Sequence, residues 1–491
     1  MASRIEIRLK RFAVFIHRWM GVAFCLLFAW WFATGVFMMY WDYPDVSAAD
    51  RLARAPALDG SLVRLLPQEA LVRLQAERLP IEAQLAAFDG RPVYRFEFGG
   101  GEERMVYADD GEEAAEFSPD LLLRAAATWT GRPAHDARFE GVLTSEDQWT
   151  VSGEFRPLRP LWKYSWPDGE EVYVSEVTGE VAQYTTRASR LGAYFGAIPH
   201  WLYFTPLRKN GKLWSRIVIG LSAVATAVAL FGVIVGVWMY VPSGRVPYTG
   251  QKRLHMILGL FFGIIAGTWA FSGMLSMDPF PTAVRSAEPD PGFKIERALR
   301  GRMPPLEAFA AKPPREALAA SHLRVKQLDL RSFDGKPVYL ATESPDRSMI
   351  VPVAGAPVAA FPENRIQAIA TETIRPDRME QSRLLTEYDA YYRDRRRQSP
   401  LPVLLIQVDD PEHSRYYIDP RTARIVGGYS SSSWVTRWLY HGLHSIDLPW
   451  LYLHRPAWDL VVLALLAGGC ALSVTSVVIA GQLLRRKLRR R

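Results

Sequence analysis

Four long apolar segments divide the chain. They cover residues 12–41, 217–241, 254–277 and 460–484, and each exceeds the roughly 20 residues that a helix needs to cross a bilayer. The first segment is longer than the apolar part of a cleavable signal peptide and lacks a small-residue cleavage site, so we expect it to be retained as a span. The pattern therefore predicts an α-helical membrane protein with four transmembrane helices.

Two large polar regions, roughly 42–213 and 278–456, separate these segments. Alternating stretches such as RPVYRFEF and EEVYVSEV, bounded by Asp-Gly, Thr-Gly and Pro, predict antiparallel hairpins, whereas residues 120–130 and 364–374 have helical spacing. Each region is therefore predicted to be a small α+β unit. The predicted division is an N-terminus (1–11), a first span (12–41), a first polar region (42–213), a second span (214–241), a linker (242–253), a third span (254–277), a second polar region (278–456), a fourth span (457–484) and a basic tail (485–491).

Positive charge is concentrated beside the apolar segments. Residues 1–18 carry five Lys or Arg, residues 241–253 carry three, and the tail RRKLRRR carries six. The positive-inside rule puts all three in the cytoplasm, together with both termini, and puts the polar regions on the opposite side, which is the periplasm for a bacterial inner membrane. Because the rest of the chain holds 45 bases and 50 acids, the net charge of +8 reflects topology in a lipid bilayer, and we expect no nucleic-acid partner.

The two halves of the chain match at a slowly drifting offset. His17, Gly21, Trp31, Thr34 and Gly35 correspond to His255, Gly259, Trp269, Ser272 and Gly273 at 238; FDGRPVY (88–94) corresponds to FDGKPVY (333–339) at 245; His200 and Trp214 correspond to His444 and Trp458 at 244. Such a match over the whole length predicts a duplication. Each half is then helix, exported domain, helix, and both enter the membrane in the same direction. This is a parallel repeat about an axis along the membrane normal.

Four histidines occupy repeated positions near the membrane boundaries. His17 and His255 lie at the cytoplasmic ends of the first and third spans, and His200 and His444 precede the second and fourth spans at the other boundary. His441 comes one helical turn before His444 and can face the same way. Because equivalent positions in a parallel repeat share a depth, we expect each pair to face one another across the axis.

The paired histidines favour haem ligation. A bis-histidine haem needs two neutral imidazoles on facing helices, an apolar slot and small neighbouring residues; Gly21 and Gly259 follow the first pair by four residues, on the same helix face. Two pairs would hold two haems, with Trp30, Trp31 and Trp269 between them, and this suits electron transfer across the membrane. A histidine at a helix end can instead anchor to headgroups or mark a proton or ion pathway, and the sequence leaves both readings open.

These motifs resemble the PepSY-associated transmembrane family. The resemblance rests on H-x-x-x-G at the start of an apolar run that ends in Thr-Gly or Ser-Gly, on FDG[RK]PVY, and on a histidine-bearing segment before the next helix, and it covers the chain in two copies. Within this family the chain is similar to inner-membrane reductases of bacterial ferric-siderophore uptake. The resemblance implies two PepSY-like periplasmic domains and two haem b groups with His17, His255, His200 and His444 as axial ligands. The IPHWLYF segment departs from the family pattern, and His441 and His444 both remain candidates for the second site.

The function implied by this resemblance is an oxidoreductase that passes electrons to a periplasmic ferric ion or ferric siderophore. Because no flavin or NAD motif is present, we expect a membrane quinol or a separate cytoplasmic reductase as the electron donor. Tyr391, Tyr392 and Arg395 in YYRDRRRQ (391–398) are candidate contacts for the ferric complex, although a solvated charged loop also explains this run. The alternative function is a haem-free membrane protein whose PepSY domains regulate or bind a periplasmic peptidase.

Overall fold

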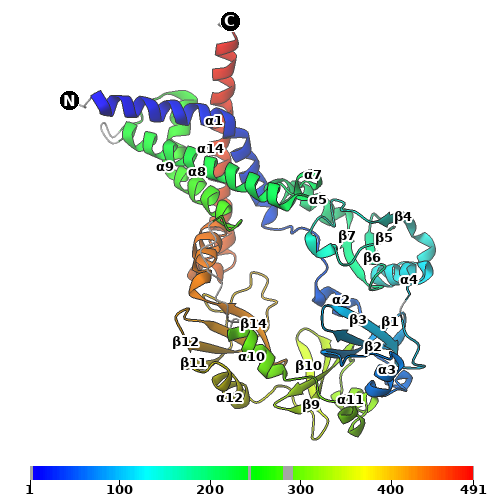
Figure 1. The fold of residues 1–491 in the computed structure, drawn as a ribbon. Helices are drawn as coiled ribbons and strands as arrows, with labels where there is room; N and C mark the ends of the chain where they lie inside the picture. The colour runs from blue at the N-terminus through cyan, green and yellow to red at the C-terminus, as the bar shows by residue number, and fades with distance from the viewer. Residues whose placement is uncertain (1–3, 115, 241–244, 280–290, 490–491) are drawn as a thin grey trace.

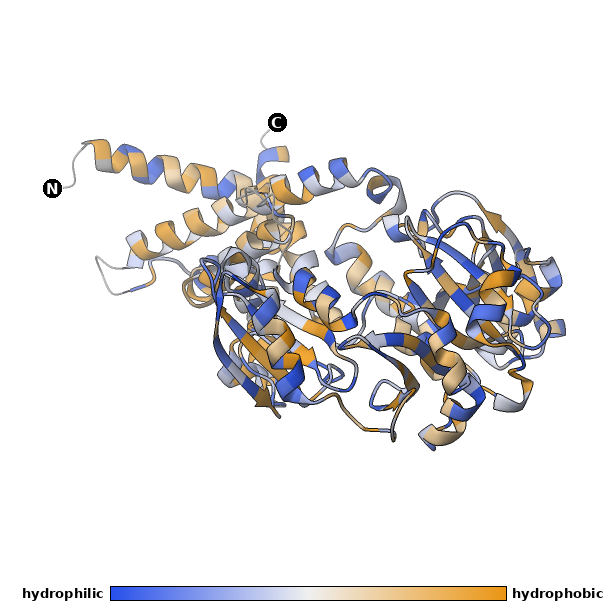
Figure 2. Ribbon diagram, turned by 60° about the horizontal axis from the view of Figure 1, so that its bottom comes forward, coloured by the Kyte–Doolittle hydropathy of each residue, from blue (hydrophilic) through white to orange (hydrophobic). Residues whose placement is uncertain are grey.

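Four long helices form one end of the molecule and three β-sheets form the other (Figure 1). The computed structural model describes residues 4–114, 116–240, 245–279 and 291–489. Both ends of the chain lie at the end of the helices that is farther from the sheets (Figure 1). Figure 2 shows that apolar residues dominate the long helices, whereas the sheets mix apolar and polar positions.

The four long helices are long and apolar enough to cross a membrane, as the apolar segments predict. Three of them begin several residues before the predicted spans, because the Lys- and Arg-rich segments that precede the apolar runs are good helix formers and continue the helix outward. The four are α1 (Arg4–Met38), α8 (Gly211–Tyr240), α9 (Gly250–Leu275) and α14 (Ala457–Leu488).

The helices pack in a ring. Helix α1 packs against α8 and α14, and α9 also packs against α8 and α14, so α1 and α9 occupy opposite corners of a four-helix bundle. Two adjacent glycines of α14 allow close approach on both sides: a Cβ on Gly469 would collide with the ring of Phe32 from α1, and a Cβ on Gly468 with the ring of Phe262 from α9. Small residues at the contacts between membrane helices permit such packing.

The polar regions share a six-stranded antiparallel sheet. Three strands from each region meet in the order β10-β9-β8-β1-β2-β3, and β1 pairs with β8 so that Gln84 lies opposite Asp329. The sequence predicted one α+β unit in each region but gave no sign that the two would join. The strands are β1 (Glu82–Phe88), β2 (Arg91–Phe98), β3 (Glu102–Tyr107), β8 (Gln327–Phe333), β9 (Lys336–Ser344) and β10 (Arg347–Pro352).

Each polar region also has a four-stranded sheet of its own. The first has the order β4-β5-β6-β7 and packs against α4 (Pro119–Thr130); the second has the order β11-β12-β13-β14 and packs against α12 (Glu363–Thr373). The two helices confirm the predictions for 120–130 and 364–374. The strands are β4 (Arg138–Leu143), β5 (Leu161–Ser165), β6 (Glu171–Ser175), β7 (Val181–Thr185), β11 (Arg378–Leu385), β12 (Val403–Asp409), β13 (Arg415–Asp419) and β14 (Arg424–Tyr429).

Short helices connect these parts. The α-helical ones are α2 (Ala48–Arg54), α3 (Pro67–Arg73), α5 (Arg187–Phe195), α6 (Ala197–His200), α7 (Thr205–Arg208), α10 (Pro291–Arg300), α11 (Pro314–Ser321) and α13 (Pro449–Tyr452). The 3₁₀ turns are η1 (Gly60–Leu62), η2 (Ala134–Asp136), η3 (Gly153–Phe155), η4 (Leu306–Ala311) and η5 (Ser431–Ser433), and η6 (Val435–Gly442) is a π-helical segment.

The two FDG motifs form tight hairpin turns, as their Asp-Gly pairs predict. Asp89 and Gly90 have φ angles of 48° and 76°, and a left-handed conformation at both central residues suits a two-residue hairpin between twisted strands. The Asp89 carboxylate also accepts hydrogen bonds of 2.9 and 2.7 Å from Arg124 of α4. Asp334 accepts a hydrogen bond of 3.1 Å from Arg365 of α12 in the same way. The motif thus ties each hairpin to a covering helix.

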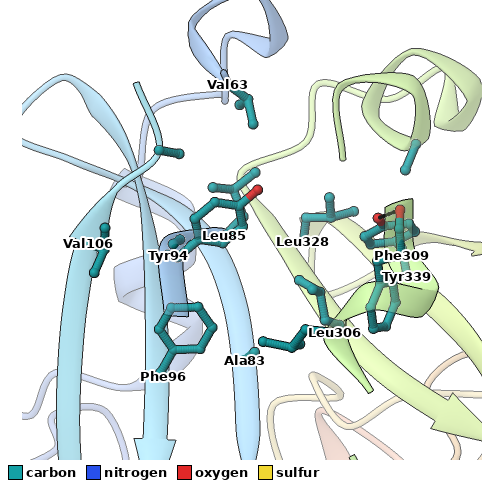
Figure 3. Packing of buried hydrophobic residues seen from close by; sticks show 14 of the residues in the cluster. Val63, Ala83, Leu85, Tyr94, Phe96, Val106, Leu306, Phe309, Leu328 and Tyr339 are labelled. Atoms are coloured by element: carbon teal, nitrogen blue, oxygen red, sulfur yellow. Dashed lines mark hydrogen bonds between the residues drawn. The ribbon is translucent and has the colours of Figure 1, made fainter. Parts of the chain in front are cut away.

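One face of the shared sheet carries a continuous apolar core. One cluster of buried residues joins the two regions. It includes the fully buried Leu85 and Tyr94 of the first region and Leu328 and Tyr339 of the second. Figure 3 shows the side chains of the two regions facing one another across the β1–β8 junction. The buried face therefore holds the two polar regions together as one body, in addition to the strand hydrogen bonds.

We predict that cysteines at Gln84 and Asp329 will form a disulfide. Residues directly opposite in an antiparallel pair have Cα atoms about 4.5–5.5 Å apart, which is within the range of disulfide geometry. The measurement is a thiol-dependent mobility shift of the Gln84→Cys/Asp329→Cys protein, with Cys25 and Cys470 replaced by alanine. The control is Gln84→Cys with Ser332→Cys, which lies about 10 Å further along β8. Equal cross-linking in both proteins would contradict the register.

Candidate functional site: two facing histidine pairs

The first histidine pair crosses the centre of the bundle. His17 of α1 and His255 of α9 have ring centroids 6.2 Å apart and planes inclined by 27°. The neighbouring helices orient both rings. His17 Nδ1 lies 3.2 Å from the carbonyl oxygen of Val228 in α8, and His255 Nδ1 hydrogen-bonds the Thr475 hydroxyl of α14 at 3.0 Å. Because α1 and α9 occupy opposite corners, these two contacts involve all four helices.

The second histidine pair lies where the polar regions meet the bundle. His200 ends α6, and His444 lies two residues after η6; their ring centroids are 6.0 Å apart and their planes are inclined by 73°. His200 Nδ1 hydrogen-bonds the Thr34 hydroxyl of α1 at 3.0 Å. His444 Nδ1 hydrogen-bonds the Ser272 hydroxyl of α9, also at 3.0 Å. The second pair is thus held against the same two helices that carry the first pair.

The same spacing separates the two pairs on both helices. Thr34 follows His17 by 17 residues on α1, and Ser272 follows His255 by 17 residues on α9. At 1.5 Å per residue, this spacing corresponds to about 25 Å along each helix axis. The two pairs therefore lie at two distinct depths of the bundle.

Glycines of α8 and α9 lie close to two of the histidine rings. A Cβ on Gly232 of α8 would lie 2.6 Å from His17 Cε1, and a Cβ on Gly273 would lie 3.6 Å from His444 Cε1. A Cβ on Gly21 would meet nothing within 4 Å, and one on Gly259 only the Leu472 side chain at 3.9 Å. The space beside Gly21 is open, whereas Gly232 is required for the position of His17. Finding Gly232 from sequence would require knowing that α1 packs on α8.

A cavity of about 840 Å³ surrounds the second pair. This volume is in the range of cofactor and ligand sites, which are commonly 300–1,000 Å³. His200 and His444 both line it, and so does His441. The His441 ring lies against Tyr440, with centroids 4.8 Å apart, whereas the His444 ring lies 6.0 Å from the His200 ring. Of the two candidates that the sequence left open, the geometry favours His444 as the partner of His200.

Burial keeps the second pair uncharged. Desolvation, with a smaller contribution from the neighbouring His444, lowers the pKa of His200 to about 3. Desolvation also lowers the pKa of His444 to about 4. Both imidazoles are therefore neutral near pH 7, which is the form of histidine that binds metals. Within the described ranges, no cluster of three or more His, Cys, Asp or Glu has the arrangement of a metal site, so any metal here would depend on the paired imidazoles.

Two candidate contacts in YYRDRRRQ do not face the cavity. Tyr392 is 3% exposed, and its hydroxyl donates a hydrogen bond to the Pro400 carbonyl oxygen at 2.8 Å. Tyr391 packs on Tyr429 with ring centroids 4.2 Å apart. Both tyrosines belong to the packing of the β11–β14 sheet, because their rings are large apolar surfaces that favour burial. Arg395, by contrast, lines the cavity.

Of the three tryptophans expected between the pairs, two hydrogen-bond to the segments that carry the second pair and one is exposed. Trp31 donates a hydrogen bond of 3.1 Å to the His200 carbonyl oxygen, and Trp269 donates one of 2.9 Å to the Leu443 carbonyl oxygen. Trp30 is 50% exposed and points away from the bundle interior. Successive helical residues are turned by about 100°, so Trp30 and Trp31 cannot both face inward. All three tryptophans lie in the stretches of α1 and α9 that separate the two pairs, and Trp30 faces outward.

We predict that Gly232→Val destabilises the protein, whereas Gly220→Val does not. Added atoms at Gly232 overlap the His17 ring, and overpacking of a tight contact costs about 1–3 kcal/mol. A Cβ at Gly220, on the same helix, would meet nothing within 4 Å. The measurement is the thermal unfolding midpoint of each variant in detergent. Equal midpoints for the two variants would mean that His17 does not occupy this position.

A comparison with known families gives a match. The family model described as PepSY-associated TM region matches residues 14–332, a range that contains His17, His200 and His255. No curated protein matches the chain.

Proposed function

The chain belongs to the PepSY-associated TM region family, and from this premise we propose that it is a b-type haem electron-transfer protein of a bacterial inner membrane. In this proposal it passes electrons to a periplasmic acceptor, a ferric ion or a ferric siderophore, and so acts as an oxidoreductase. The observation that carries the proposal is the presence of two facing histidine pairs at two depths of an apolar four-helix bundle.

The spacing of the rings supports ligation of one iron by each pair. An iron at about 2.0–2.1 Å from one nitrogen of each imidazole, the usual metal–imidazole distance, separates the ring centroids by roughly 6–6.5 Å. The observed separations are 6.2 Å for His17 and His255 and 6.0 Å for His200 and His444. The donor set also fits, since two neutral imidazoles are common axial ligands and bundle cores commonly hold such groups.

The hydrogen bonds of the rings support the same assignment. In each of the four histidines it is Nδ1 that contacts a carbonyl or hydroxyl oxygen. The four oxygens belong to Val228, Thr34, Thr475 and Ser272. A metal-binding histidine typically bonds its second ring nitrogen to such an oxygen, which fixes the ring and raises the basicity of the ligating nitrogen. Nε2 is thereby left as the ligating atom.

In the proposed function, the protein positions the haem and protects it. When bound, haem supplies reversible one-electron chemistry. His17, His255, His200 and His444 would hold it through Nε2, the hydroxyls of Thr34, Ser272 and Thr475 would orient the rings, and the apolar helices would exclude water. Phe32 packs on Trp269 with ring centroids 5.6 Å apart, and both rings line the cavity beside the second pair.

Several contacts support a parallel repeat as the basis of this arrangement. Trp214 donates a hydrogen bond of 2.8 Å to the Trp201 carbonyl oxygen, and Trp458 donates one of 3.0 Å to the carbonyl oxygen of Ser445. The donor and the acceptor of the first contact correspond to those of the second at an offset of 244. In the shared sheet, Gln84 pairs with Asp329, its own counterpart at 245. A twofold axis through this junction and through both histidine pairs would account for all of these contacts.

The direction of electron flow follows from the proposed orientation. With the basic termini in the cytoplasm, the first pair would lie near the cytoplasmic face and receive electrons from a membrane quinol or a separate cytoplasmic reductase. The second pair would lie near the periplasmic face, beside the cavity, and deliver them to the ferric complex. The alternative of a peptidase-regulating PepSY protein gives no reason for four partly buried imidazoles in facing pairs.

We predict about two low-spin haem b groups per chain. The measurement is a reduced-minus-oxidised visible spectrum of purified protein with haem quantified per polypeptide. His17→Ala and His444→Ala should each remove about one haem, because each leaves one ring of a pair without its partner. His441→Ala is the matched control and should keep both, since His441 does not face His200. A protein that holds no haem after expression with a haem precursor would refute the proposal.

We also predict that Thr34→Val weakens haem binding at the second pair by about 10- to 100-fold, the usual effect of removing a hydrogen bond from a metal-binding histidine. Valine keeps the shape of threonine but cannot bond His200 Nδ1. The measurement is haem retention during dilution in detergent. Thr226→Val is the control, because the Thr226 hydroxyl bonds only the Ser222 carbonyl oxygen of its own helix. Equal retention by the two variants would contradict the role of Thr34.

A further inference from the structure

The lining of the cavity beside the second pair is charged on one side only, whereas its aromatic residues come from both halves of the chain. Its charged side chains, apart from the histidines, all come from the second polar region, and they are Arg393, Asp394, Arg395 and Asp447. The first polar region contributes the aromatic residues Trp201 and Tyr203, and Trp214 of α8 lies beside them. At the repeat offset of 244, Asp447 corresponds to Tyr203. The asymmetry is therefore a property of the second half and is not inherited from the duplication.

Most of the charges on the charged side already have partners. The Asp394 carboxylate accepts backbone N–H bonds from Arg396 and Gln398 at 2.8 and 2.7 Å. Arg393 pairs with Asp447. Asp447 lies 3.9 Å from a further arginine, Arg437, and both are 4% exposed at their side chains. Arg437 does not line the cavity, but when it is counted with the lining residues, three arginines stand against the two aspartates.

Arg395 is the cation left over. Its guanidinium donates to the Met39 carbonyl oxygen and lies 5.7 Å from the centre of the Trp458 ring. Among the residues that the structure describes, no carboxylate forms an ion pair with it. Burial lowers the pKa of Arg395, and the nearby Arg455 lowers it further. A partly buried cation without a counter-ion is costly, and an oxyanion in the cavity would relieve this cost with charge-assisted hydrogen bonds.

The shape and chemistry of the cavity point to an amphiphilic planar ligand. Trp201, Trp214 and Trp269 offer flat apolar surface, and the charged lining residues come from the second polar region alone. A tetrapyrrole has one edge of apolar substituents and one edge with two carboxylates. The two sides of the cavity therefore match the two edges of such a ligand when its centre lies between His200 and His444.

We propose that Arg395, with Arg393 beside it, binds a propionate carboxylate of the tetrapyrrole at the second pair, and so determines which edge of the ligand faces the second polar region. The proposal rests on the proposed function, because it requires haem in this cavity. The same arginine chemistry could be used by a carboxylate of the ferric complex, and the experiment below separates the two sources.

The test compares haem with haem dimethyl ester, whose carboxylates are blocked. In a His17→Ala background the second pair is the only complete pair, and haem-free protein is titrated with each ligand. We expect Arg395→Gln to weaken haem binding by roughly 10- to 100-fold, the scale of one hydrogen bond to a charged group, and to leave dimethyl ester binding unchanged. Arg395→Lys, which keeps the charge, should recover part of the loss. Arg396→Gln is the control, since Arg396 is in the same loop and pairs with Asp42 away from the cavity.

Each outcome decides between distinct conclusions. Equal losses for haem and its dimethyl ester would mean that Arg395 supports the fold of the cavity and does not contact a carboxylate, which overturns the proposal. Unchanged haem binding combined with weaker binding of ferric citrate to haem-loaded protein would assign the arginine to the acceptor, which also overturns it. If neither the His17→Ala protein nor the unmodified chain binds haem or haem dimethyl ester, the proposed function itself is refuted.

Discussion

The need to bury imidazole rings inside an apolar bundle constrains the whole helical part of this protein. A polar ring nitrogen without a partner is costly away from water, and each of the four rings meets this requirement through an oxygen of a neighbouring helix. His17 needs the Val228 carbonyl oxygen of α8, and His255 needs the hydroxyl of Thr475 in α14. These contacts fix the relative rotation of the helices more tightly than apolar packing alone, because a hydrogen bond requires a particular direction and an apolar contact does not.

The second constraint comes from the opposite end of the molecule. The two halves of the chain meet in the bundle and meet again at the β1–β8 junction. Motion of one half relative to the other would therefore have to break either the hydrogen bonds of the sheet or the contacts around the histidines. The second histidine pair lies between these two attachments, and its rings are carried by segments that lead from the polar regions into α8 and α14. Its geometry is thus held from both ends.

The sequence predicted the parts of this structure that depend on local pattern. The apolar segments predicted the four long helices, helical spacing predicted α4 and α12, and Asp-Gly predicted the hairpin turns at Asp89 and Asp334. It also predicted which histidines face one another, because equivalent positions in a repeat lie at equal depth. These features depend on hydrophobic periodicity or on the conformational preference of a few adjacent residues.

Other features depend on contacts between distant segments, which no local sequence pattern indicates. The role of Gly232 depends on the packing of α1 on α8, and the burial of Tyr392 depends on the position of its loop over the β11–β14 sheet. The position of Arg395 in the cavity wall also follows from this loop.

The register of β1 against β8 has a consequence for half of the chain taken alone. Gln84 lies at the centre of the junction. Ala83 pairs with Leu330, which corresponds to Leu85 at the offset of 245, and Leu85 pairs with Leu328, which corresponds to Ala83. A polypeptide containing only the first half would present β1 as a bare edge, with unpaired backbone groups ready to bind another strand. A second copy of the same half, with Gln84 against Gln84, satisfies this edge in an equivalent register. In the proposed parallel repeat, the present fold would correspond to a symmetric homodimer whose two subunits are joined in one chain.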